Sequence, residues 1–118
     1  MQVREQYVVL DADDLEATAA FWARLLDGQV EGDADWKDVR REGRTLICVQ
    51  HAPGLVPPDW PDGAPQQVHL DLAVDAIEPA HAEAVAAGAR VLKAPEPADE
   101  HGFAVYADPA GHPFCLCW

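Results

Sequence analysis

The sequence predicts an α+β protein made of two similar halves, and three observations support this fold class. Residues 7–16 (YVVLDADDLE) have a counterpart in residues 69–78 (HLDLAVDAIE). Residues 43–50 (GRTLICVQ) have a counterpart in residues 111–118 (GHPFCLCW). Each half reads as a strand, a helix and several short strands. Such a repeat indicates two small units that must pack together, because neither can bury a core alone.

The first half opens with an apolar, β-branched strand over residues 8–12. The pair Asp13-Asp14 supplies an N-cap and an acidic first turn, which suits the start of a helix. Gly28 is expected to end this helix. Apolar residues recur at helical spacing between these points (Leu15, Trp22, Leu25 and Leu26). Three short strands follow, over residues 29–31, 36–41 and 45–50.

The second half repeats this order after a proline-rich segment. We expect one domain over residues 1–118, with a first module at about 5–51, a crossover loop at 52–66 and a second module at about 67–118. His81 is expected at the surface of the second helix, which ends at Gly88. Asp108-Pro-Ala-Gly111 is a tight-turn signal. The expected elements are strands over 68–74, 90–92, 103–107 and 113–118, a helix over 77–87 and an exposed turn over 95–100.

Period-two alternation assigns the side chains of the strands to two faces. Leu70 and Leu72 face the helices, so His69 and Asp71 face the opposite, concave side. The equivalent concave positions of the other repeat-related strands are Tyr7, Val9, Asp11, Cys115 and Cys117. In residues 46–50 both faces are apolar, so the choice between Gln50 and Cys48 as the cavity residue stays open, with both favoured inward.

Composition limits the function classes. A net charge of −13 repels phosphate backbones and anionic lipids, so neither nucleic acid nor a membrane is an expected partner. The first residues carry no apolar signal core and no apolar run reaches the length of a membrane span, so we expect a cytoplasmic protein. The three cysteines lie in apolar strands and are an odd number, which indicates reduced thiols rather than a disulfide framework.

Several motifs, taken together, resemble the vicinal oxygen chelate superfamily of glyoxalase I, bleomycin-resistance proteins and extradiol dioxygenases. The closest resemblance is to its glyoxalase-like domain proteins, and it covers nearly the whole chain. The motifs are VVLDADDLE (8–16), Phe21-Trp22 before LLDG (25–28), VPPDWP (56–61), PQQVHLDL (65–72) and DPAGHPFC (108–115). The resemblance implies two βαβββ modules that form a cupped mixed sheet.

The resemblance also implies where a divalent metal would bind. Catalytic members use one residue from the first strand and one from the last strand of each module, and these positions are Tyr7, Gln50 (or Cys48), His69 and Cys115. Only His69 matches the usual His, Glu or Gln, His and Glu set cleanly. A neutral tyrosine is a poor ligand, and loss of the last carboxylate removes a ligand and a general base. The expectation is therefore no cofactor, with a divalent metal as the alternative.

Three further sets of residues could carry chemistry or bind a ligand. His69 and Asp71 lie two residues apart on one strand face and could act as an oriented acid/base pair, although a polar pocket lining is the simpler reading. Cys48, Cys115, Cys117 and His69 form a Cys/His set that could hold zinc, but small buried thiols filling a strand face are commoner. Trp36 and Trp60 could present indoles to a planar cation or serve only in packing.

We therefore expect a protein that binds a small organic molecule, cationic or aromatic, in the cupped sheet without the usual metal centre, as in bleomycin-resistance-like sequestration. The alternative is a lyase, isomerase or dioxygenase that uses His69 with a divalent metal or with Asp71. The family resemblance also implies a homodimer. The expected ligand contacts are Tyr7, Asp11, Trp36, Gln50, Trp60, His69, Asp71 and Cys115, with His69 and Asp71 as the candidate catalytic residues.

Overall fold

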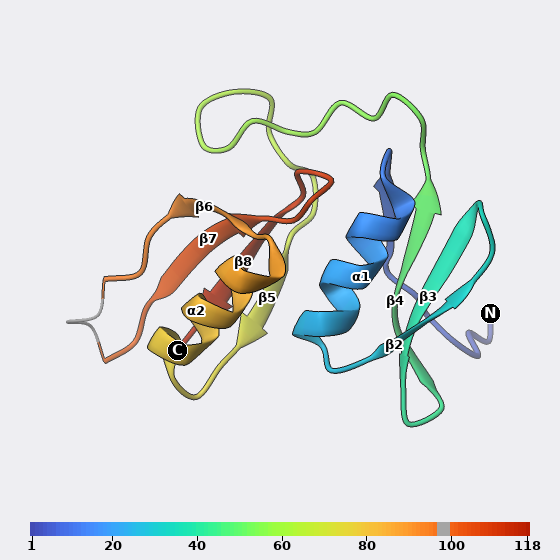
Figure 1. The fold of residues 1–118 in the computed structure, drawn as a ribbon, viewed down its shortest axis with the longest axis horizontal. Helices are drawn as coiled ribbons and strands as arrows, with labels where there is room; N and C mark the ends of the chain where they lie inside the picture. The colour runs from blue at the N-terminus through green and yellow to red at the C-terminus, as the bar shows by residue number, and fades with distance from the viewer. Residues whose placement is uncertain (97–99) are drawn as a thin grey trace. The chain divides into compact units, whose positions relative to one another are not determined.

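A computed structural model of the chain describes residues 1–96 and 100–118. It confirms the α+β class and two βαβββ repeats, which form two compact units, Met1–Leu55 and Val56–Trp118 (Figure 1). Each unit is one helix on one four-stranded mixed sheet. Part of the turn expected over residues 95–100 lies outside the described residues. No helix in the described part of the chain is long and apolar enough to cross a membrane.

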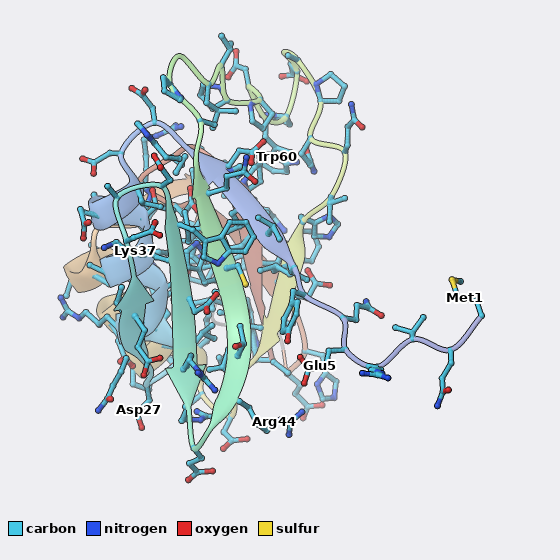
Figure 2. All side chains as sticks on the ribbon, turned by 90° about the vertical axis from the view of Figure 1, so that its right-hand side faces the viewer. Met1, Glu5, Asp27, Lys37, Arg44 and Trp60 are labelled. Atoms are coloured by element: carbon cyan, nitrogen blue, oxygen red, sulfur yellow. The ribbon has the colours of Figure 1, made fainter. Side chains whose placement is uncertain are left out.

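The first unit has the strand order β1-β4-β3-β2, with β1 and β4 parallel and the other pairs antiparallel. The side chain of Asp14 caps α1 by accepting from the N–H of Ala17 at 3.0 Å. The helix packs on β3 and β4. Lys37 of β3 reaches α1, where its Nζ lies 2.9 Å from Glu16 Oε1 (Figure 2). The elements are β1 (Val9–Ala12), α1 (Leu15–Leu25), β2 (Gln29–Gly32), β3 (Trp36–Arg41) and β4 (Arg44–His51).

The core of the first unit lies between α1 and the sheet. Trp22 is 1% exposed and meets Phe21 edge to face, with ring centroids 5.4 Å apart. Opposite them lie Val39 and Ile47, which pair across β3 and β4 and are both buried. Burial of these apolar side chains is the main stabilising term of the unit.

The prediction that Gly28 ends the first helix is confirmed in position but not in its reason. The helix ends at Leu25 and Gly28 N–H donates back to Ala23 O at 2.8 Å, but the residue in the left-handed region is Asp27, with φ of 50°. Gly28 is needed for a different reason, since a Cβ there would lie 2.8 Å from Val39 Cγ1. Gly28 in the sequence therefore predicts the change of chain direction after the helix, but it does not show which residue has the positive φ.

The second unit repeats the arrangement with the order β5-β8-β7-β6, and its helix contacts β8. The tight turn after β7 is confirmed, because Gly111 N–H donates to Asp108 O at 2.9 Å. Strand β5 is shorter than the predicted 68–74, so His69 precedes it directly. The elements are β5 (Leu70–Ala73), α2 (Ile77–Ala87), β6 (Arg90–Lys93), β7 (Phe103–Ala107) and β8 (Pro113–Cys117).

The core of the second unit contains a polar contact that the sequence does not reveal. Tyr106 and Phe114 are fully buried and stack at 5.5 Å between ring centroids. The Tyr106 hydroxyl lies 2.9 Å from Nδ1 of His81 on α2. His81 is therefore half-buried and hydrogen-bonded, which corrects the expectation of a surface histidine. Burial raises the pKa of Tyr106, so the phenol stays neutral.

Candidate functional site

The concave face of the first sheet brings together three of the predicted ligand contacts. Gln50 of β4 pairs with Trp36 of β3 on one side and with Asp11 of β1 on the other. These three side chains therefore form one row across the sheet, on the face opposite α1. The next row on the same face holds Asp38, Cys48 and Val9. Gln50 and Cys48 thus share this face, with Gln50 exposed and Cys48 only 2% exposed.

Trp36 is held in place by its own strand and by the turn before it. Its indole Nε1–H donates to Asp38 Oδ1 at 2.8 Å, which ties the ring to the next residue on the same face. The carboxylate of Asp33 accepts from the N–H groups of Asp35 and Trp36, and these bonds hold the pKa of Asp33 below its ordinary value. Gly32 closes the turn, since any Cβ there would overlap the carbonyl oxygen of Trp36.

Cys48 is a buried, protonated thiol beneath this face. Desolvation, followed by the hydrogen bond and the charge of the neighbouring Asp38, raises its pKa from 9.0 to about 12. A thiol with so high a pKa carries almost no thiolate at neutral pH and is a poor nucleophile. Asp38 therefore touches both Trp36 and Cys48, and it is the residue of this face that sequence reasoning missed. The spacing Trp36-x-Asp38 is the signal that could have found it.

This shifted thiol makes stability depend on alkaline pH. The unfolded thiol ionises near 9.0 and the folded thiol near 12, so the free energy of unfolding falls as pH rises between these values. The expected slope from this group is about 1.4 kcal/mol per pH unit. Urea unfolding of the wild type and Cys48→Ala across this range measures it, because the other thiols and Tyr106 contribute equally to both proteins. If the difference in free energy of unfolding between the two proteins does not change with pH, the raised pKa is not that of Cys48.

The second unit holds a separate cluster on the concave face of its sheet. His69 Nε2 lies 3.4 Å from Asp71 Oδ1, and Asp71 pairs with Cys115 across β5 and β8. Ligand atoms of these three residues all lie within 4.8 Å of one another. His69 and Asp71 are about half exposed, whereas Cys115 is partly buried. Desolvation, followed by the hydrogen bond to Asp71, raises the pKa of Cys115 to about 11.

The remaining predicted contacts lie elsewhere in their units. Tyr7 precedes β1, is 50% exposed and lines a cavity with Arg4 and Thr45 instead of joining the Trp36 row. Trp60 is half-buried in the loop of the second unit, which Asp59 N–H closes by donating to Ala64 O at 2.8 Å. The roles of these two residues in ligand binding stay predictions.

The residues at the superfamily's metal positions do not form its usual donor set. Tyr7 lies outside the strand ladder, and Cys115 offers a protonated thiol where a carboxylate is usual. A nitrogen, a carboxylate oxygen and a sulfur do meet at His69, Asp71 and Cys115, and this set suits a zinc-like ion better than a hard cation. These three residues could therefore hold a metal within the second unit alone.

Fold and sites together define an α+β protein with two βαβββ units, the first of which has a polar and aromatic sheet face. The chain belongs to the glyoxalase-like domain family, whose model matches residues 7–117. Its structural neighbours include a fosfomycin resistance protein, a glyoxalase/bleomycin resistance protein/dioxygenase family enzyme and a bleomycin-binding protein. No curated protein matches the sequence significantly.

Three solved structures illustrate the similarity of the fold. The fosfomycin resistance protein FosX of Mesorhizobium loti matches with TM-score 0.73 and 14% identity, over 99% of this chain and 92% of its own. A glyoxalase/bleomycin resistance protein/dioxygenase family enzyme of Burkholderia phytofirmans matches with TM-score 0.69 and 20% identity, over 94% of each chain. A bleomycin-binding protein complexed with bleomycin matches with TM-score 0.65 and 24% identity, over 98% of each chain.

Proposed function

We propose that this protein binds a small organic molecule with a planar cationic group on the concave face of its first sheet, without the superfamily's usual metal centre. The observation that carries the proposal is the Trp36 indole, fixed by its 2.8 Å hydrogen bond to Asp38. A ring held in one orientation loses little entropy when a ligand stacks on it. Asp11 and Gln50 lie in the same row and offer a carboxylate and an amide.

The chemistry of this face favours cations. Asp11 and Asp38 contribute negative charge, and an indole face attracts a cation with about 0.5 to 2 kcal/mol. The net charge of −13 adds a long-range field of the same sign, which raises the local concentration of cationic ligands. The thiol of Cys48 beneath the face is buried and neutral, so it adds no competing reactivity.

The bleomycin-binding relative supports sequestration as the biological role, because its structure contains bleomycin. In this role, residues 1–118 act as one glyoxalase-like domain that captures a drug-like molecule. We also propose a cytoplasmic location and a homodimer, on the basis of the sequence and the family resemblance. Sedimentation of the purified protein at two concentrations tests the dimer directly.

Removal of the Asp38 charge tests the binding proposal. Isothermal titration with ethidium, a planar aromatic cation, should give saturable binding to the wild type. Asp38→Asn should weaken this binding about tenfold or more, because it removes one charge near the ligand and changes the hydrogen bond that holds Trp36. The matched control is Glu83→Gln, which removes an exposed acid from α2. Equal weakening in both variants would indicate only the general field, and no binding to the wild type would refute the proposal for this class of ligand.

A second candidate function rests on the cluster of His69, Asp71 and Cys115. Here the protein would be a lyase, isomerase or dioxygenase of the superfamily. The 3.4 Å contact of Nε2 with Asp71 orients the His69 imidazole, which leaves Nδ1 to hold or move a proton. A divalent metal bound by the three residues would supply Lewis acidity at the same place.

Metal content separates the two candidates. The leading proposal expects less than stoichiometric Zn, Ni, Fe or Mn in protein purified without an affinity tag, measured by elemental mass spectrometry. The second candidate expects about one equivalent per chain that is lost in His69→Ala and kept in His101→Ala, which changes an exposed histidine outside the cluster. Stoichiometric metal that survives His69→Ala would contradict the assignment of the cluster.

A further inference from the structure

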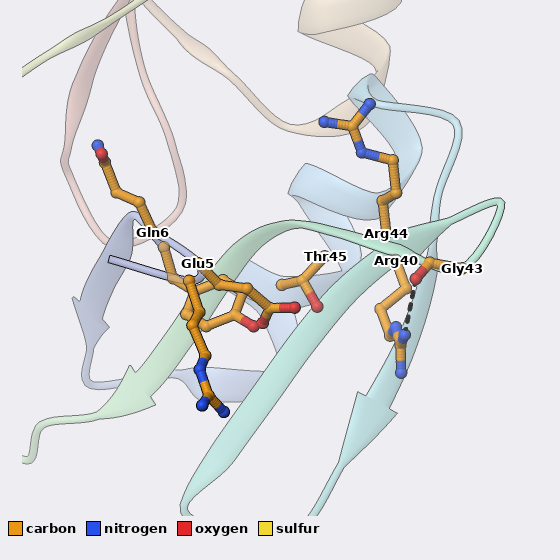
Figure 3. Close-up of a pocket in the computed structure, with 8 residues that line it drawn as sticks. Glu5, Gln6, Arg40, Gly43, Arg44 and Thr45 are labelled. Atoms are coloured by element: carbon orange, nitrogen blue, oxygen red, sulfur yellow. Dashed lines mark hydrogen bonds between the residues drawn. The ribbon is translucent and has the colours of Figure 1, made fainter. Parts of the chain in front are cut away.

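A cavity of about 350 Å³ lies at the opposite end of the first sheet from Trp36. Trp36 pairs with Gln50 at one end of the β3–β4 hairpin, whereas Arg41 pairs with Arg44 at the other. The cavity lies at this second end, beside the chain that enters β1. Its lining includes Arg40 and Thr45 from the hairpin and Tyr7 from the entering chain. Figure 3 shows the hairpin residues and the entering Glu5 and Gln6 around it.

A β-bulge brings two of the lining residues together. Val39 pairs with Ile47 in the ladder, so a regular register would pair Arg40 with Leu46. The register shifts between Val39 and Arg40, and Arg40 pairs with Thr45 instead. The guanidinium and the hydroxyl therefore belong to the same rung and both line the cavity. Bulges of this kind redirect side chains and are common beside binding sites.

The cavity concentrates positive charge in a strongly acidic chain. Three of the eight lysines and arginines line it, namely Arg4, Arg40 and Arg44, while Glu5 is its one acidic lining residue among those described. Glu31 partly offsets Arg40, with Oε2 3.4 Å from its Nη1. The net charge of the lining side chains is thus opposite in sign to the net charge of the chain.

Arg40 and Arg44 both bring hydrogen-bond donors to the lining of the cavity. Nη2 of Arg40 donates to Gly43 O at 3.0 Å, which fixes the side chain across the end of the hairpin (Figure 3). Arg44 is exposed and also lines the cavity, and in Figure 3 its guanidinium points away from that of Arg40. A guanidinium has five donors in a rigid fork that matches carboxylate and phosphate oxygens. The hydroxyls of Thr45 and Tyr7 add neutral donors.

We infer that this cavity binds an organic oxyanion, a carboxylate or a phosphate monoester with an aromatic or apolar body. The volume lies at the lower end of the range for small-molecule pockets and exceeds what a bare phosphate fills. The half-exposed ring of Tyr7 provides a wall for the body of the ligand. This inference does not depend on the proposed function, because the site lies at the other end of the sheet and prefers the opposite charge.

Amide chemical-shift titration of the full chain tests the inference, with benzoate, phenyl phosphate and inorganic phosphate as probes. We expect saturable shifts at Gly43, Arg44 and Thr45 with at least one organic probe at millimolar concentration, and a response to inorganic phosphate that is weaker. The double variant Arg40→Gln, Arg44→Gln should weaken binding about tenfold or more. The relative affinities of benzoate and phenyl phosphate identify which oxyanion the site takes.

Matched variants keep the result interpretable. Arg90→Gln removes an exposed charge from the second unit and should leave the affinity for the oxyanion unchanged. The same spectra report whether the double variant is folded, and Arg44→Gln alone, at an exposed position, serves if it is not. Absence of saturable shifts, equal weakening in Arg90→Gln, or inorganic phosphate binding as tightly as phenyl phosphate would each overturn the inference.

Discussion

Replacement of Trp22 by alanine is expected to lower the free energy of unfolding of the first unit by about 3 to 5 kcal/mol. Trp22 is 1% exposed and contacts Phe21 edge to face, so its loss removes both apolar burial and an aromatic contact. The cavity left between α1 and the sheet cannot close easily, because Val39 and Ile47 on the opposite side are held in the strand ladder. Urea unfolding followed by circular dichroism measures this loss.

The matched control for this variant is Val85→Ala, which trims an apolar residue on the exposed side of α2. Alanine has the higher helix propensity, so the control should change stability by less than about 1 kcal/mol in either direction. A Trp22→Ala protein as stable as the control would show that the core does not depend on α1 packing as described.

Replacement of Trp36 by alanine should weaken binding of a planar aromatic cation about tenfold or more, with little effect on stability. The indole is only half-buried, so its main role on this account is to present a ring face to the ligand. Trp36→Phe should lie between wild type and alanine, because it keeps an aromatic ring but loses the Nε1–H donor to Asp38. Isothermal titration of the three proteins with ethidium measures the series.

The control for aromatic loss is Trp118→Phe, a half-buried tryptophan of the second unit that packs near Gly102. It should bind the cation as the wild type does. Equal affinity of Trp36→Ala and wild type would mean that the indole does not contact the ligand, and the polar row at Asp11 and Gln50 would then have no aromatic wall.

Much of the fold could be predicted because the sequence states its main features twice. Residues 7–16 match residues 69–78, and residues 43–50 match residues 111–118, so the repeat can be seen in the sequence. Period-two alternation in Leu70–Ala73 separates the helix side of the strand from its concave side. The same rule places Asp11 and Gln50 on one face, and the ladder pairs them directly. These features follow from the pattern of residues within each strand and helix, so they can be predicted from composition and spacing.

The parts that could not be predicted depend on contacts between distant residues. The bond between His81 and Tyr106 joins a helix to a strand 25 residues away, and an amphipathic pattern cannot show it. The pairing of Arg40 with Thr45 needs a bulge that shifts the register by one residue. The contact of Asp38 with Trp36 is different, because the two residues are close in the sequence and their spacing on one strand face could have revealed it.

Titration calorimetry of metal-depleted protein with a planar aromatic cation, in the presence of a chelator, tests directly whether the first sheet binds the ligand without metal. We expect saturable binding that is unchanged in His69→Ala and weakened in Trp36→Ala, because the ligand contacts the indole and the acids of the first sheet. Binding that disappears on metal removal, returns with added metal and is lost in His69→Ala would contradict the account and assign ligand recognition to the cluster of His69, Asp71 and Cys115.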